Sequence, residues 1–156
     1  KAYREILEAI TNGETAILLG ARGTGKTALA VCALRSAAFQ GRTVHHVDAA
    51  DLFAEFRQTF RNEEASDSEM GLIAWYTEVG LLAIDETHDR GHTEYEDRIL
   101  SRIVNKRYAA LRSPTILISN ETRSAASESL GASIVSRVHE AGKVIECDWP
   151  SFREPA

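Results

Sequence analysis

An α/β fold built on a central parallel sheet is the class that this sequence predicts, and three observations lead to it. Short apolar runs alternate with stretches of helical character along the 156 residues, which is the order that a parallel sheet requires. A glycine-rich segment at residues 20–27 joins the first apolar run to the helical stretch after it. Two adjacent carboxylates, Asp85 and Glu86, end another apolar run, and the carboxyl ends of strands are where open α/β sheets bind ligands.

Composition limits the classes of protein to which this chain can belong. Apolar residues make up 44% of the chain and charged residues 26%, which is ordinary for one globular domain with a real core. The formal net charge is -5, so any contact with nucleic acid has to come from a local basic patch. Cys32 and Cys147 stand far apart without metal-ligand spacing, which favours a reducing compartment, and Cys32 is expected to be a buried thiol.

The first half of the chain predicts two strands and their helices. Residues 15–19 are an apolar run after an Asn12-Gly13 turn, and Gly41 would end the helix that follows the glycine-rich segment. Asp48 suits the N-cap of a helix that carries Leu52, Phe53, Phe56 and Phe60. The expected elements are helices at 2–10 and 27–40, strands at 15–19 and 43–47, the helix after Asp48, a polar loop at 62–69, and a short helix at 70–78.

The second half continues the alternation. The run at 81–84 is continuously apolar, as a buried parallel strand would be. Residues 94–112 show the longest helical pattern, with Tyr95, Ile99, Ile103 and Arg107 on one stripe. Pro114 stops this helix, and further strands are expected at 115–118 and 143–147, with one or two short helices at 124–139 broken near Gly131. No run approaches membrane-spanning length, and we expect no signal peptide; with the cysteine usage described above, the expected location is the cytoplasm.

The glycine-rich segment has the spacing of a phosphate-binding loop, Gly20-x-x-x-x-Gly25-Lys26-Thr27. Glycines let the backbone approach phosphates closely, and N–H groups at the start of a helix attract anions. Lys26 would reach the outer phosphates, and the Thr27 hydroxyl would ligate Mg²⁺. The sequence thus predicts a P-loop NTPase that binds ATP or ADP through Gly20, Gly23, Thr24, Gly25, Lys26, Thr27 and Ala28.

The second half of the nucleotide site is predicted at the ends of two other strands. Asp85 would hold Mg²⁺ through its water shell beside Thr27, and Glu86 would deprotonate the attacking water. Asn120 follows the strand at 115–118 and would reach the same edge of the sheet, where its amide can bond the γ-phosphate or the water. His88 and His92, four residues apart beside acidic groups, suggest a zinc site, but Gly91 between them argues against a regular helix there.

The chain resembles the AAA+ ATPase domain of DnaC-type replicative helicase loaders and, more distantly, IstB-type transposition helper ATPases. The resemblance covers most of the chain, from the phosphate-binding loop to the C-terminus. Besides the loop and the Asp85-Glu86 pair, it is carried by Thr59-Phe60-Arg61-Asn62, Glu94-Tyr95-Glu96, Leu130-Gly131 with Arg137, and Trp149-Pro150-Ser151-Phe152-Arg153. It implies a three-layer αβα domain of the AAA+ type over residues 1–156, as a fragment that lacks an N-terminal helicase-binding region.

The resemblance also implies roles for residues that the pattern alone does not single out. Arg137 would be an arginine finger that reaches the ATP site of a neighbouring protomer, and Arg153 a second sensor of the γ-phosphate. Arg57, Phe60 and Arg61 would face single-stranded DNA, although core packing beside Phe53 and Phe56 explains Phe60 equally well.

The implied function is ATP-dependent loading of a hexameric replicative helicase, in the cytoplasm of a bacterial or phage-infected cell. The implied partners are that helicase, single-stranded DNA and further copies of the chain, arranged head to tail in a spiral. Two alternatives stay open: a transposition helper that bends duplex DNA, and an ATP-gated single-stranded DNA adaptor with negligible hydrolysis.

Overall fold

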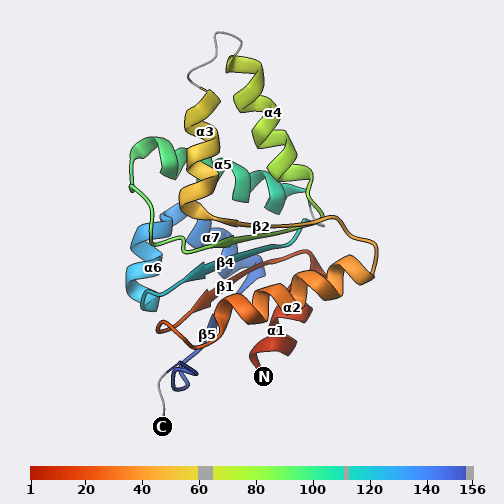
Figure 1. The fold of residues 1–156 in the computed structure, drawn as a ribbon, viewed down its shortest axis with the longest axis vertical. Helices are drawn as coiled ribbons and strands as arrows, with labels where there is room; N and C mark the ends of the chain where they lie inside the picture. Colours follow the sequence, from red (N-terminus) through yellow and green to blue (C-terminus); the bar gives the residue numbers. More distant parts are fainter. Residues whose placement is uncertain (60–64, 111–112, 154–156) are drawn as a thin grey trace.

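A five-stranded sheet forms the centre of the domain (Figure 1). The computed structural model describes residues 1–59, 65–110 and 113–153, without the side chains of 65–68. The strands are β1 (Thr15–Leu19), β2 (Val44–Asp48), β3 (Leu81–Asp85), β4 (Thr115–Ser119) and β5 (Gly142–Glu146). The helices are α1 (Ala2–Asn12), α2 (Lys26–Phe39), α3 (Ala49–Thr59), α4 (Ala65–Glu78), α5 (Glu94–Ala109), α6 (Arg123–Leu130) and α7 (Ala132–Ala141).

All strand pairs are parallel, and the order across the sheet is β2-β3-β4-β1-β5. This order makes β3, β4 and β1 neighbours, so the segments that follow their carboxyl ends lie at one edge of the sheet. The predicted strands are confirmed, each within a residue or two of its expected bounds.

Helices cover both faces of the sheet, which confirms the three-layer αβα arrangement. Alternate residues of β1 show the division, because Ala16 and Leu18 belong to the core under α1 and α2. Ile17 and Leu19 belong to the second core, which the sheet shares with residues of α3 to α7. Figure 1 shows α1 and α2 on one side of the sheet and α3 and α4 on the other.

Two expectations about the helices are wrong. The segment 62–69 was expected to be a loop, but α4 already begins at Ala65; once Ile73 and Tyr76 bury one face of this helix, each further residue adds a backbone hydrogen bond at little cost. Cys32 was expected to be buried and is exposed. The face of α2 that meets the sheet carries Ala30, Ala33 and Ala37, and Cys32 projects away from it at helical spacing.

Arg107 is a buried arginine that the sequence placed on a helical stripe. Its side chain is fully enclosed and donates to the carbonyl oxygens of Tyr76 (2.8 Å), Thr77 (3.0 Å), Val79 (2.7 Å) and Pro114 (2.7 Å). It also donates to the hydroxyl of Thr115 at 2.8 Å. Because Tyr76 and Thr77 lie in the last turn of α4, this arginine caps carbonyls that have no partner within their own helix.

The described helices include none with the length and apolar character needed to cross a bilayer.

Candidate nucleotide-binding site

The phosphate-binding loop connects β1 to α2, as predicted. Its glycines adopt the left-handed backbone region, with φ of 86° at Gly23 and 80° at Gly25, where other residues are strained. Lys26 is buried, and its ammonium group donates to the carbonyl oxygens of Gly20 (2.7 Å) and Ala21 (2.8 Å). Burial lowers the pKa of Lys26, and nearby acidic groups oppose that shift. The ammonium therefore lies within the loop, where the outer phosphates of a nucleotide would meet it.

Thr27 and Asp85 meet across the site. The Thr27 hydroxyl donates to Oδ2 of Asp85 at 2.7 Å, and Oδ1 of the same carboxylate accepts from the backbone N–H of Glu86 at 2.8 Å. His46, on β2, lies 3.4 Å from Oδ2 through its Nε2, a neighbour that sequence reasoning did not assign. A hydroxyl and a carboxylate held in contact are the oxygen ligands that suit Mg²⁺, so these residues fit the ion.

Glu86 and Asn120 also meet, at the ends of β3 and β4. The Asn120 amide donates to Oε2 of Glu86 at 3.1 Å. Nε2 of His88 lies 3.2 Å from the same oxygen. Glu86 is half-buried and has a positive φ of 51°, a conformation that costs a non-glycine residue energy and that often occurs at functional sites. The structure thus brings the two predicted residues together and adds His88 to them.

The segment after β5 packs onto the phosphate-binding loop. The indole N–H of Trp149 donates to the carbonyl oxygen of Thr24 at 2.9 Å, and the backbone N–H of Phe152 donates to that of Gly23 at 3.0 Å. A Cβ at Gly23 would collide with the Ser151 hydroxyl, and one at Gly20 with the Cys147 carbonyl. These glycines are therefore required for contact with the C-terminal segment as well as for the loop itself, a role that the spacing alone does not reveal.

A cavity of about 420 Å³ lies over the loop. The residues that line it are Arg22, Gly23, Gly25, Lys26, Thr27, Ala28, Asp85, Glu86, Asn120, Phe152 and Arg153. The structure thus places Arg153, expected to be a sensor, on the wall of the same cavity as the loop, Glu86 and Asn120. Its volume lies within the range of small-molecule and cofactor sites, and its lining combines cationic side chains with a hydroxyl and carboxylates.

Arg137 does not line this cavity. It lies on α7, where it is 3.5 Å from Glu140 and 4.9 Å above the ring centre of Tyr108. Its side chain keeps 42% of its surface exposed. A finger that acts on a neighbouring subunit has to be accessible and away from its own site, and Arg137 meets both conditions.

Of the three residues expected to contact DNA, the structure describes Arg57. Arg57, near the end of α3, donates to Oε1 of the buried Glu96 at 2.9 Å, with 53% of its side chain exposed. The arginine therefore already has one partner on α5 while about half of its side chain is exposed. Phe60 and Arg61 lie outside the described residues, so the choice between core packing and DNA contact for Phe60 stays a prediction.

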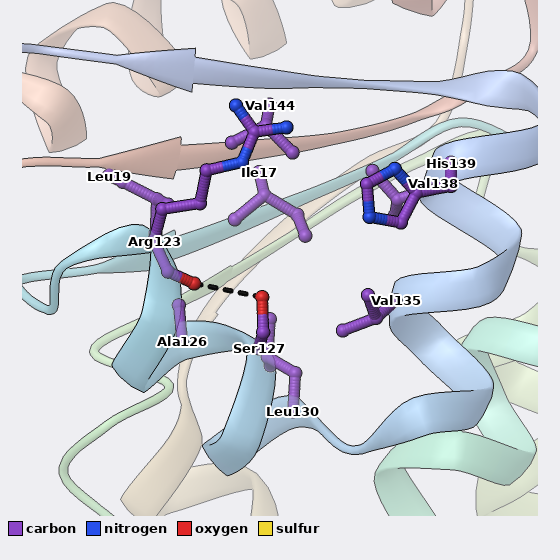
Figure 2. Close-up of a pocket in the computed structure, with 10 residues that line it drawn as sticks. All are labelled: Ile17, Leu19, Arg123, Ala126, Ser127, Leu130, Val135, Val138, His139 and Val144. Carbon is purple, nitrogen blue, oxygen red and sulfur yellow. Dashed lines mark hydrogen bonds between the residues drawn. The ribbon is translucent and has the colours of Figure 1, made fainter.

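A second pocket lies between α6, α7 and the sheet (Figure 2). Aliphatic side chains such as Ile17, Leu130 and Val138 surround it, and Arg123 and His139 also line it. Its volume of about 20 Å³ holds roughly one water molecule. This pocket is too small for a nucleotide.

The fold and this site define a nucleotide-binding domain of the AAA+ P-loop type. A family model described as "IstB-like ATP binding protein" matches residues 5–154. The chain belongs to this family of IstB-like ATP-binding proteins.

Relatives and solved structures agree with this assignment. The chain is 29% identical over 154 residues to the replicative helicase loader DnaC of Escherichia coli K12, a match that spans 98% of this chain and 62% of that protein. The corresponding protein of Buchnera aphidicola from Acyrthosiphon pisum is 29% identical over 99% of this chain and 61% of its own length. The chain thus spans less than two thirds of the curated relatives that it matches.

Among solved structures, AMPPCP-bound DnaA from Aquifex aeolicus superposes with a TM-score of 0.77 at 26% identity, over 93% of this chain and 45% of that one. A crystal structure of the DnaC helicase loader gives a TM-score of 0.70 at 23% identity, over 92% of this chain and 85% of that one. These likenesses confirm the AAA+ fold.

Proposed function

We propose that this chain is the ATPase domain of a helicase loader, which binds ATP with Mg²⁺ and hydrolyses it while placing a hexameric replicative helicase on single-stranded DNA. One observation carries the proposal: Lys26, Asp85, Glu86 and Asn120 line one cavity at the carboxyl ends of three adjacent strands. The curated relatives that match nearly the whole of this chain are named replicative helicase loaders. Both of these relatives come from bacteria, so the proposed location is the bacterial cytoplasm.

The residues of the cavity have distinct tasks in this proposal. The loop from Gly20 to Ala28 wraps the phosphates, and Lys26 exchanges its two backbone carbonyls for phosphate oxygens. Thr27 and Asp85 would hold Mg²⁺, which neutralises charge that builds up on the phosphates. Arg153, on the cavity wall, senses the γ-phosphate from the same subunit.

Glu86 is the proposed general base. A proton passes from water to its carboxylate as the water oxygen bonds to the γ-phosphorus. The bond from phosphorus to the leaving oxygen of ADP breaks in the same displacement. Asn120 orients the carboxylate and the water. A positioned base of this kind contributes about 10²–10⁴-fold to rate.

Arg137 of a neighbouring copy completes the site in a head-to-tail spiral. Its contacts with Tyr108 and Glu140 in its own subunit are partly exposed, and such contacts are each worth about 1 kcal/mol or less. The arginine can therefore leave them at small cost when a neighbouring site offers phosphate oxygens. A finger supplied in trans is typically worth about 10³–10⁵-fold in turnover.

Arg57, Phe60 and Arg61 are the proposed contacts to single-stranded DNA, through phosphate contacts and ring stacking. The replication initiator DnaA bound to AMPPCP and single-stranded DNA, 26% identical with a TM-score of 0.72, supports a DNA-binding role for this fold. The helicase would be contacted by a region N-terminal to this domain.

A transposition helper is the second candidate, because the matching family model is described as IstB-like. That function requires preference for duplex DNA over single strands. A third candidate, an ATP-gated adaptor, requires turnover that stays at background with DNA and helicase present.

A loading assay tests the proposal. The protein is incubated with the replicative helicase of its host and with forked DNA coated by single-strand-binding protein, with ATP or without nucleotide. Helicase loading that depends on both the protein and ATP is the expected result. A Lys26→Ala variant is the control and should lose the ATP-dependent loading. Tight binding to duplex DNA without helicase capture would support the transposition helper and contradict the loader.

A further inference from the structure

His88 lies two residues beyond Glu86 in the turn between β3 and α5, with 25% of its side chain exposed. Its imidazole touches both residues that the proposed hydrolysis places at the water. Nε2 is 3.2 Å from Oε2 of Glu86 and 3.1 Å from the Asn120 amide nitrogen. Nδ1 accepts from the backbone N–H of Asn120 at 3.4 Å.

These contacts assign the proton on the ring. A backbone N–H can only donate, so Nδ1 has to be the acceptor, and the neutral imidazole then carries its hydrogen on Nε2. Nε2–H therefore donates to Oε2 of Glu86, which also accepts from the Asn120 amide at 3.1 Å. The short distance between the two nitrogens follows from their sharing one acceptor.

The backbone of this turn is fixed independently of the imidazole. The N–H and the hydroxyl of Thr87 both donate to the carbonyl oxygen of Ile118 on β4, at 2.9 and 3.0 Å. The N–H of Asp89 donates to the Glu86 carbonyl at 2.8 Å. Since these bonds hold the main chain, loss of the imidazole should free the Glu86 side chain while the turn keeps its place.

We propose that His88 is a positioning residue for the general base. Its Nε2–H and the Asn120 amide together hold Oε2 of Glu86, which leaves Oε1 as the oxygen that takes the proton from water. The inference rests on the proposed ATP hydrolysis at Glu86. It adds a residue that contacts the base and is not among the residues that line the cavity.

Steady-state kinetics with the residue changed in two ways tests this role. His88→Ala removes the donor, and we expect kcat to fall about 10- to 100-fold because small displacements of a reacting group have effects of this size. The KM for ATP and the affinity for a fluorescent ADP analogue should stay within about twofold, since binding to the loop is unaffected. His88→Gln keeps an amide donor within reach of Glu86 and should recover most of the lost rate. His139→Ala, an exposed histidine on α7, is the control and should match the wild-type protein.

Unchanged kcat in His88→Ala would overturn the proposal. It would also be overturned if both variants lost nucleotide affinity and thermal stability together, because that indicates a role in folding the turn. Glu86→Gln separates this failure from failure of the proposed function: if the wild-type protein turns over ATP no faster than Glu86→Gln, hydrolysis itself is refuted. A long-range ¹H–¹⁵N NMR spectrum tests the tautomer of His88 independently of ATP hydrolysis. We expect the Nε2–H tautomer, and the Nδ1–H tautomer would contradict the assignment.

Discussion

Replacing Arg107 with Met should strongly destabilise the domain. Met fills similar apolar volume but has no donor, so the carbonyl oxygens of Tyr76, Thr77, Val79 and Pro114 lose the guanidinium. A buried acceptor left without a partner costs about 1–3 kcal/mol. Water and small backbone shifts would recover part of the sum over the four acceptors, so we expect the free energy of unfolding to fall by about 3–5 kcal/mol.

Urea unfolding followed by circular dichroism measures this effect at neutral pH. Burial lowers the pKa of Arg107 to about 10, so the wild-type guanidinium is charged there. Arg102→Met, an exposed position on the same helix, is the control and should change stability by less than about 0.5 kcal/mol. If Arg107→Met does not fold, Arg107→Lys retains the charge with fewer donors and should lose a smaller amount. A loss below about 1 kcal/mol in Arg107→Met would refute the capping role assigned to this residue.

Three further predictions concern the site. Glu86→Gln should bind ATP as the wild-type protein does but hydrolyse it about 10²–10⁴-fold more slowly; phosphate release beside an equilibrium binding titration checks this, and unchanged turnover would remove Glu86 from the base role. Trp149→Phe keeps the aromatic packing but removes the hydrogen bond to Thr24. The free energy of unfolding should fall by about 1 kcal/mol, which lowers the melting temperature by a few degrees, and nucleotide binding should weaken. Nucleotide affinity equal to that of the wild-type protein would show that the C-terminal segment does not support the loop. Thr27→Val removes the hydroxyl that meets Asp85 and should abolish the gain in ATP affinity that Mg²⁺ gives over EDTA, whereas a persisting gain would place the ion elsewhere.

The end of the fold that carries the candidate nucleotide site could be predicted because it depends on local patterns. Buried parallel strands are short apolar runs, and the phosphate-binding loop has a fixed spacing, so both are visible in the chain itself. The carboxyl ends of parallel strands lie at one edge of the sheet. The proximity of Asp85, Glu86 and Asn120 could therefore be predicted without knowledge of the strand order.

Features that depend on contacts between distant segments could not be predicted. The stripe on α5 shows that Arg107 faces inward, but not that it caps the end of α4 and bonds the carbonyls of Val79 and Pro114. The same limit applies to Trp149 and Ser151, because sequence spacing does not reveal that the segment after β5 returns to the loop. Cys32 was placed wrongly because apolar Ala and Leu residues occur on every face of α2. The sequence therefore does not mark which face of this helix meets the sheet.

His88 illustrates the limit within the site. Beside His92 and several carboxylates it resembled part of a metal site, whereas in the structure its ring meets Glu86 and Asn120. The signal that finds it is its place two residues after Glu86, the proposed general base, in a turn whose backbone is bonded to β4 through Thr87.

A mixing experiment tests most directly whether the ATP site is completed by a neighbouring copy. Arg137→Ala keeps an intact cavity but lacks the finger, and Glu86→Gln keeps the finger but lacks the base. Each alone should hydrolyse ATP near background with single-stranded DNA present. Mixed in equal amounts, they should hydrolyse ATP well above the sum of the two, because Arg137 of one copy then serves Glu86 of the next. Turnover of the mixture no greater than that sum would contradict a site shared between protomers.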